Sequence, residues 1–267
     1  MRVAVLAASV WGPGLAGWDA ARPVLAGAAP YDPVFVPPPP PALLPANERR
    51  RTGPVVRLAL AVAGEAAAAC GIAPALLRSV FASANGDGPV VGGILEALSA
   101  GGATEGRLVS PTQFGNSVHN GAAGYWSIAT GGSQPADCLG CGDATWAAAL
   151  LAAAAEVHAA GAPVLVVTYD QPLPPPLAAK RPILAPFAAA LVLAPPDQVG
   201  WAQLDIEYEA APARPDAVEP ALPDLRALAL GNPAAQSLRL LEHLARGVSG
   251  ACPAQYLAGH LRVEVLA

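Results

Sequence analysis

The chain has 267 residues, which suits one sizeable domain, and it carries 15 Lys and Arg against 20 Asp and Glu, a net charge of −5. An acidic chain whose only basic run is Arg49, Arg50 and Arg51 argues against electrostatic binding of nucleic acid. Its longest fully apolar run, 146–155, is far shorter than the roughly 20 residues needed to span a membrane. We therefore expect no nucleic-acid partner, no membrane span and a cytoplasmic location.

Charged residues make up only 13% of the chain, about half of the roughly 25% usual for soluble proteins. Two explanations remain open. Either the chain gives a large apolar surface to a partner, or a coding bias has favoured alanine, proline and glycine. The four cysteines, Cys70, Cys138, Cys141 and Cys252, do not suggest a disulfide framework in a chain of this length.

The first part of the chain predicts a buried strand, an extended segment and a helix. Residues 3–10 form a short apolar run that favours a buried strand over a signal peptide. The proline run at 36–41 should be extended and lie on the surface. The next helix should begin at Pro54, which suits the first helical position, and stop at Gly71.

Strands and helices alternate through the rest of the chain. We expect strands over residues 76–84, 135–139, 163–168, 188–193, 204–209 and 261–265. We expect helices around Ile94, over 120–130 and 143–160, and across most of 222–246. A glycine-rich loop at 101–102 and proline-rich loops at 172–176 and 212–223 connect them. This alternation predicts a layered α/β domain with a largely buried sheet.

The turn between Asp137 and Thr145 has the form of a nucleophile site. A short strand runs into a glycine-containing turn that holds Cys138 and Cys141, and a helix of small residues begins directly afterwards. A cysteine at a helix N-terminus feels the positive end of the helix dipole, which lowers the thiol pKa and favours the thiolate. The alternative is that both cysteines are small buried hydrophobic residues.

The spacing of Cys138 and Cys141 also occurs in redox and zinc sites. A zinc site usually needs a second pair of ligands, and no other Cys or His pair here has suitable spacing. A redox pair of the thioredoxin type would lie near the start of a βαβ unit rather than in the middle of the chain. We therefore predict no metal site.

The segment from Ser110 to Asn120 is dense in polar and aromatic residues within an otherwise alanine-rich chain. Irregular segments of this composition often form functional sites. His119 could act as a base, or it could be a hydrogen-bonded structural residue beside Asn120.

These two segments, in this order, resemble the N-terminal half of β-ketoacyl synthases, and above all the ketosynthase-like chain length factors of aryl polyene pathways. The resemblance is carried by residues 110–120, 123–131 and 141–151 and spans most of 1–195. It implies an α/β, layered thiolase-like fold: a single half ketosynthase domain with a mixed sheet and flanking helices. We accordingly predict a ketosynthase-like half domain over 1–195. The remaining tail, 196–267, has a strand, helices and a final strand, and it packs either on the core or on the partner.

The resemblance also bears on catalysis. In the family the strand-to-helix turn carries Asp-Thr-Ala-Cys-Ser, and laid on Asp137 without gaps this puts Gly140 at the nucleophile position, with Cys141 one residue late. The family takes two histidines and a lysine from its C-terminal half, and neither a Gly-Thr-Gly-Thr loop nor a Lys…Gly-His motif appears in this sequence. Decarboxylative condensation needs a thiolate and enolate-stabilising histidines. The resemblance thus implies a subunit with no catalytic residue of its own and no cofactor.

By resemblance, the chain is a chain length factor that pairs with an active β-ketoacyl synthase in polyene or fatty-acid-type elongation and meets acyl carrier protein through that complex. The residues expected to line the acyl pocket or the subunit interface are Gln113, Phe114, Asn116, Ser117, His119, Asn120, Cys138, Gly140, Cys141 and Asp143. Two alternatives stay open: an active small acyltransferase or condensing enzyme that uses Cys141, and a purely structural subunit of a synthase complex.

Overall fold

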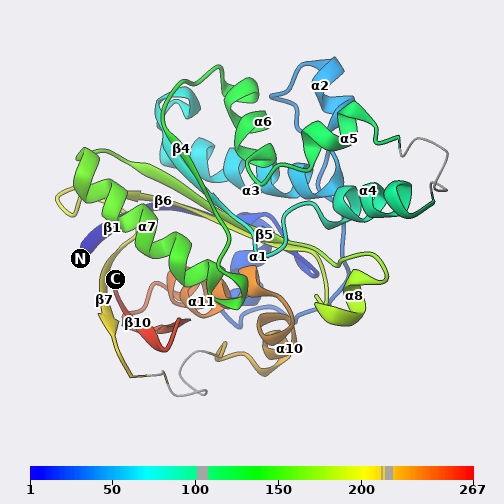
Figure 1. The fold of residues 1–267 in the computed structure, drawn as a ribbon. Helices are drawn as coiled ribbons and strands as arrows, with labels where there is room; N and C mark the ends of the chain where they lie inside the picture. Colours follow the sequence, from blue (N-terminus) through cyan, green and yellow to red (C-terminus); the bar gives the residue numbers. More distant parts are fainter. Residues whose placement is uncertain (101–107, 212, 214–218) are drawn as a thin grey trace.

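The computed structural model describes residues 1–267 except 101–107, 212 and 214–218. The predicted glycine-rich loop at 101–102 and part of the loop at 212–223 lie outside the described residues. The strands form a single ten-stranded sheet (Figure 1). They are β1 (Arg2–Gly12), β2 (Leu15–Ala16), β3 (Arg78–Ala82), β4 (Ala136–Leu139), β5 (Val164–Asp170), β6 (Phe187–Ala194), β7 (Ala202–Glu209), β8 (Gly250–Ala251), β9 (Ala254–Tyr256) and β10 (Gly259–Leu266).

The sheet mixes parallel and antiparallel neighbours in the order β4-β3-β5-β6-β1-β7-β10-β8, with β2 paired to β1 and β9 to β10. β3 runs parallel to both β4 and β5, whereas β6, β1, β7 and β10 follow as successive antiparallel neighbours. β5 and β6 are buried along their whole length, as strands covered on both faces should be. The predicted layered α/β class with a mixed sheet and flanking helices is confirmed.

Helices cover both faces of the sheet. They are α1 (Trp18–Leu25), α2 (Ala46–Arg51), α3 (Pro54–Cys70), α4 (Gly88–Ala100), α5 (Pro111–Asn116), α6 (Gly121–Thr130), α7 (Thr145–Ala160), α8 (Leu177–Lys180), α10 (Pro223–Gly231) and α11 (Leu238–Arg246). Short 3-10 turns are η1 (Pro74–Leu76), η2 (Gly142–Ala144) and η3 (Pro233–Ser237). α3 and α6 pack on one face, and α1, α7 and α11 pack on the other, which gives three layers (Figure 1).

The α3 helix has the ends that the sequence predicts. Pro54 occupies its first turn, where the missing N–H costs no intrahelical bond, and Gly71 ends it in the left-handed conformation at φ 71°. Its buried residues lie on more than one side, since the helix is covered by the sheet below and by α6 beside it. α3 is therefore a central element of its layer and not a surface helix.

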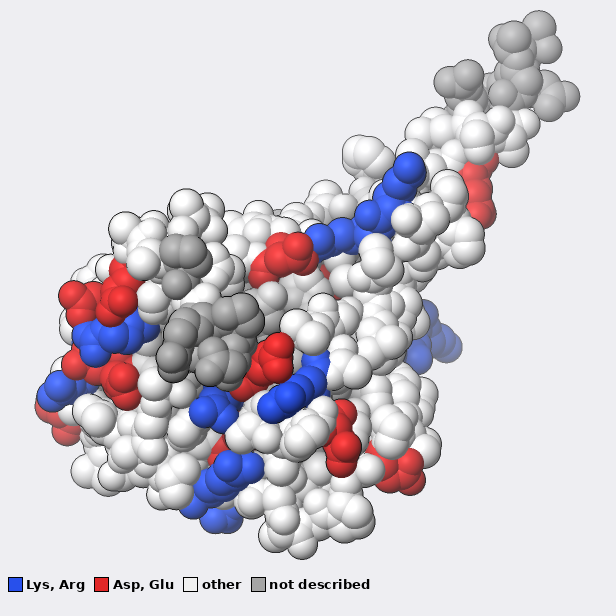
Figure 2. Space-filling model, turned by 90° about the horizontal axis from the view of Figure 1, so that it is seen from below, with Lys and Arg blue, Asp and Glu red and all other residues white. Residues whose placement is uncertain are grey.

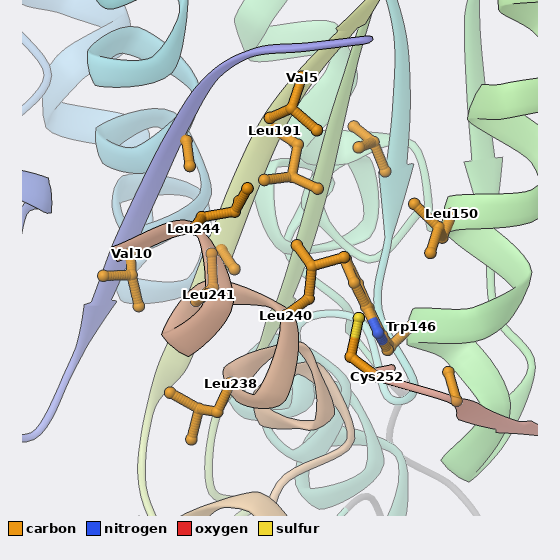
Figure 3. Packing of buried hydrophobic residues seen from close by; sticks show 14 of the residues in the cluster. Val5, Val10, Trp146, Leu150, Leu191, Leu238, Leu240, Leu241, Leu244 and Cys252 are labelled. Atoms are coloured by element: carbon orange, nitrogen blue, oxygen red, sulfur yellow. The ribbon is translucent and has the colours of Figure 1, made fainter. Parts of the chain in front are cut away.

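The tail of the chain packs on the core. β7 pairs with β1, and β10 pairs with β7 from His260↔Glu209 to Leu266↔Gln203. Figure 3 shows leucines of α11, among them Leu241, directed towards sheet residues such as Val5 and Leu191. This tail extends the same sheet and fills the same apolar layer as α7.

Several predicted elements differ by one or two residues at their starts from the observed ones; β7, for example, begins at Ala202 and β10 at Gly259. The strand expected from Leu76 begins only at Arg78, because Pro74 opens a 3-10 turn that leaves Leu76 exposed and turns Leu77 inward. The helix expected from Asp143 begins as the turn η2 before it becomes α-helical at Thr145. The sequence analysis did not predict five short elements in the first and last thirds of the chain, because their apolar patterns are too short to recognise. They are α1, α2, β2, β8 and β9.

Charged side chains are sparse on the face of the molecule seen in Figure 2. Seen from below, Lys and Arg side chains alternate with Asp and Glu, with wide uncharged areas between them (Figure 2). Within the described ranges, no helix is both long and apolar enough to cross a membrane.

Candidate functional site

The candidate site lies at the end of the sheet where the three parallel strands finish. Ser83, Gly140 and Asp170 stand at or just beyond the carboxyl ends of β3, β4 and β5, and these strands are immediate neighbours. Ligands of α/β proteins bind at the carboxyl ends of parallel strands, because helix and loop connections leave a crevice there. In Figure 1, α4 and α8 follow β3 and β5 at this end.

The two cysteines of the predicted nucleophile turn have different surroundings. Cys138 is half-buried in β4 against the layer that holds α3 and α6, and burial, helped by neighbouring Asp137, raises the pKa of its thiol. Cys141 is exposed, and its backbone N–H donates to Thr145 Oγ1 over 3.0 Å. Cys141 is therefore not a buried hydrophobic residue, whereas burial disfavours the thiolate form of Cys138.

Gly140 lies between the cysteines and directly against His119. A Cβ atom built on Gly140 would lie 3.1 Å from Ser83 O, 3.2 Å from His119 Cε1 and 3.3 Å from His119 Nε2. The imidazole is held there because His119 Nε2 donates to Leu139 O over 2.6 Å. The structure thus brings His119 and Gly140 together, although 21 positions separate them in the sequence.

Asp143 turns away from this contact. It is exposed and forms an ion pair with Arg181 of the segment after α8, at 2.6 Å from Asp143 Oδ1 to Arg181 Nη2. Its backbone carbonyl accepts a hydrogen bond from Gln236 Nε2 at 3.0 Å. Asp143 therefore links the start of α7 to α8 and to η3.

The segment from Gln113 to Asn120 forms α5 and the turn after it. Ser110 caps the helix by accepting from the Gln113 N–H at 3.5 Å, and Ser117 Oγ donates to Phe114 O at 2.8 Å. The Phe114 side chain is 67% exposed, which is unusual for an aromatic residue with no polar group. The structure therefore presents an apolar ring at the surface of the predicted site.

A groove of about 490 Å³ runs between α2, α5 and α6, a volume within the range of ligand pockets. Asn116 and Asn120 line it together with Arg51 and Tyr125. Asn116 is held in place: its Oδ1 accepts from Tyr125 OH at 3.2 Å and its Nδ2 donates to Arg51 O at 3.5 Å. Of the predicted site residues, Cys138, Gly140 and His119 surround the ends of β3 and β4, whereas Asn116 and Asn120 face this groove.

The sequence analysis missed Asp170. Its carboxylate is buried, and Oδ1 accepts from Ser83 Oγ and from the Ala84 N–H, each at 2.9 Å. The other oxygen, Oδ2, meets no hydrogen-bond donor among the described residues. Burial raises the pKa of Asp170 to about 6, although these hydrogen bonds and the charge of Arg181 oppose the rise. An acidic residue at the end of a buried, mainly apolar parallel strand is the signal that could have found it.

No cluster of three or more His, Cys, Asp or Glu side chains that could hold a metal ion occurs in the part of the chain that the structure describes. The pair Cys138 and Cys141 stays free of a disulfide bond.

Comparisons with known proteins identify the family of this chain and structures of similar fold. The family model of the N-terminal domain of β-ketoacyl synthases matches residues 26–247, so the chain belongs to that family. A search of curated proteins finds no match.

Solved structures of similar fold include one entitled as a ketosynthase (ApeO) in complex with its chain length factor (ApeC) from Xenorhabdus doucetiae. It has a TM-score of 0.70 and 20% identity, and the alignment covers all of both chains. Another is the ishigamide ketosynthase/chain length factor, with a TM-score of 0.71, 14% identity and coverage of 100% of this chain and 99% of that one. A third is AntDE:AntF, a type II polyketide synthase acyl-carrier protein in complex with its ketosynthase, with a TM-score of 0.74, 12% identity and coverage of 100% and 99%. At these identities they establish the ketosynthase-like fold.

Proposed function

We propose that this chain is a noncatalytic ketosynthase-like subunit, a chain length factor, that pairs with an active β-ketoacyl synthase and shapes its acyl pocket in polyene or fatty-acid-type elongation. The observation that carries the proposal is that no nucleophilic side chain is present at position 140. The residue that aligns with the family's nucleophile is glycine, and a side chain there would press on His119 and Ser83. Without a thiolate at this position, no acyl chain can be held for condensation.

The exposed features around the site support pairing with a partner. β4 is the edge strand of the sheet, and its residues Ala136 and Asp137 are exposed. An unpaired edge is a ready template for another chain. Phe114 on α5 and Ile128 on α6 add exposed apolar side chains close to the groove beside α6. Structures of similar fold contain a ketosynthase with its chain length factor or with an acyl-carrier protein, and we extend both partners to this chain.

Several finer points belong to the same proposal. We place the subunit in the cytoplasm, with acyl carrier protein reaching it through the complex. The division into a ketosynthase-like unit, 1–195, and a tail, 196–267, is also proposed. This boundary falls between β6 and β7, which both pair with β1.

The test is native mass spectrometry of this chain, alone and co-expressed with its β-ketoacyl synthase, after incubation with acylated carrier protein. We expect a 1:1 heterodimer that carries the acyl group only on the synthase. Cys141→Ser should leave product formation unchanged, since Cys141 takes no part in the reaction.

One specific observation favours a rival function. Cys141 is exposed just before the first turn of α7, so an active acyltransferase or condensing enzyme using this thiol has an accessible nucleophile. An acyl adduct on Cys141 that disappears in Cys141→Ser would establish that rival and end the noncatalytic proposal.

The length of the product distinguishes a chain length factor from a purely structural subunit. Phe114→Ala should leave the stability of the isolated chain within about 0.5 kcal/mol of the wild type, because the ring is mostly exposed. In the complex it should lengthen the product, since removing a bulky side chain enlarges the pocket. Leu257→Ala is the matched control: it removes a similarly exposed apolar side chain at the hairpin between β9 and β10. An unchanged product length in Phe114→Ala would favour the structural role.

A further inference from the structure

Glycine at position 140 is explained by its neighbours and not by its backbone. Its φ angle lies outside the left-handed region, which side chains avoid, so the main chain there would accept any residue. What a side chain would meet is close contact: the Cβ position lies 3.1–3.3 Å from Ser83 O and from two atoms of the His119 ring, so these neighbours would have to move by a few tenths of an ångström. Such separations are tighter than ordinary van der Waals contact between these atoms.

His119 is an exposed residue, and its ring has a close neighbour on each of two sides. On one side it lies against Gly140, and on the other its Nδ1 is 3.6 Å from the position that a Cβ on Gly86 would take. Its Nε2 donates to Leu139 O, which accepts, so the ring carries its proton on Nε2 in this arrangement. The imidazole therefore lies between the turn after β3 and the end of β4.

The turn after β3, which contacts the His119 ring through Gly86, is held in place by hydrogen bonds. Gly86 N–H donates to Ser83 Oγ at 2.9 Å, and Ser83 Oγ in turn donates to Asp170 Oδ1 at 2.9 Å. The Ala84 and Asn85 N–H groups point at the same carboxylate oxygen, at 2.9 and 3.3 Å. Asp170 thus anchors the turn from β5, the strand directly beside β3.

We propose that His119 is a positioning residue that fastens the segment from Ser110 to Asn120 to the carboxyl ends of β3 and β4 by taking the space beside position 140. The inference deepens the proposed function, on which it rests: the same contact that would crowd a nucleophile side chain at position 140 holds Gln113 and Phe114 in place for the partner's acyl pocket. Within the same segment, Asn116 meets Arg51 and Tyr125, which lie on helices. His119 makes the connection to the sheet.

Hydrogen–deuterium exchange on the full-length chain measures this fastening directly. The reporters are the Phe114 N–H, which donates to Ser110 O at 2.9 Å, and the Ser117 N–H, which donates to Phe114 O at 3.1 Å. In His119→Ala we expect exchange across 113–120 to rise about five- to tenfold, as loss of one hydrogen bond and its packing allows more frequent local opening. Gly140→Ala should give a similar rise, because the added methyl displaces the ring.

Two further variants control the experiment. His119→Gln keeps a side-chain N–H that can reach Leu139 O, and it should restore exchange to near the wild-type rate. Gly64→Ala adds the same methyl group within α3, where the nearest atom is Leu43 Cδ1 at 3.8 Å, and exchange across 113–120 should not change. Unchanged exchange across 113–120 in His119→Ala would overturn the inference, whatever the complex produces.

The second readout is the product-length distribution of the complex reconstituted with the β-ketoacyl synthase. We expect His119→Ala to broaden that distribution and His119→Gln to return it towards the wild type, an effect that a merely structural histidine would not have. If exchange rises but product length stays the same, the pocket role in the proposed function fails while the anchoring by His119 stands. If His119→Ala instead abolishes an acyl adduct on this chain, the histidine acts in chemistry and both proposals fall.

Discussion

The two ends of this molecule differ in how their residues are held. At one end, α11 packs apolar side chains against the sheet, and the sheet strand β10 alternates buried and partly exposed residues along its length. At the carboxyl ends of β3, β4 and β5, the contacts are polar and specific. The ring of His119 lies beside Gly86 and Gly140, and Ser83 donates a hydrogen bond to the carboxylate of Asp170. The first region depends on the amount of apolar area buried, whereas the second depends on individual atoms.

This difference predicts that the two regions respond to mutation in different ways. The core layer should lose stability in proportion to the volume removed. The polar end should lose order, or change its pH dependence, with little loss of apolar area. The experiments below test that contrast, beginning with the largest expected effect.

The largest effect should come from Leu241→Ala in α11, whose side chain is fully buried under the sheet. The variant removes apolar contacts and leaves a cavity, so the free energy of unfolding should fall by about 2–5 kcal/mol in denaturant titration. Leu230→Ala is the control, because Leu230 of α10 is 74% exposed and its removal should change stability by less than about 0.5 kcal/mol. Equal effects of the two variants would contradict the assigned packing of α11.

Asp170→Asn should change the pH dependence of stability. Burial raises the pKa of Asp170 from its ordinary 3.8 to about 6, so the folded state favours the protonated carboxyl group. The stability that this group contributes is fully present below about pH 4 and is lost as the pH rises through 6. Relative to the wild type, Asp170→Asn should therefore gain roughly 2–3 kcal/mol between pH 4 and pH 7.5, because asparagine does not ionise.

Chemical denaturation at several pH values measures this gain. Asp19→Asn, at an exposed position on α1, is the matched control and should follow the wild-type profile. Profiles of Asp170→Asn and the wild type that run parallel from pH 4 to pH 7.5 would show that Asp170 is not buried as described.

The smallest effect separates two glycines of the same turn. Gly142 has a φ of 57° and open space around it, so Gly142→Ala should cost about 1 kcal/mol through backbone strain alone. Gly142→Asn should cost less, because asparagine tolerates the left-handed region. At Gly140 the order should reverse, since the larger asparagine crowds His119 more than alanine does. Thermal melts of the four variants compare the two positions, and the same ranking at both would refute the distinction.

The sequence predicted most of the fold because its strands are short apolar runs between clear turn signals. Val164 to Thr168, for example, could only form a buried strand, and Gly71 marked the end of α3. The same reasoning left open where the tail would pack, since the alternation in β10 shows which face is buried but not which neighbour covers it. Pairing of β10 with β7 is a tertiary choice that local pattern does not contain.

The candidate site was predicted only in part for a related reason. The polar composition of residues 110–120 indicated a functional segment, and the family alignment put Gly140 at the nucleophile position. The contact between Gly140 and His119 depends on two separate segments meeting over the end of β4. Similarly, Asp170 gains its raised pKa only when β5 is buried among helices, and the charge of Arg181, placed by α8, opposes that rise.

The contact between His119 and position 140 also limits how the protein can change through single substitutions. Residues in direct contact have non-additive effects, so the order in which they are replaced matters. A cysteine introduced at position 140 first would meet the imidazole ring and Ser83 O. The same cysteine introduced after a smaller residue at position 119 would meet Ser83 O alone. Any mutational path from this chain towards an acyl-accepting thiol at that position therefore runs more easily through the loss of His119, and each intermediate along it would have a loosened 110–120 segment.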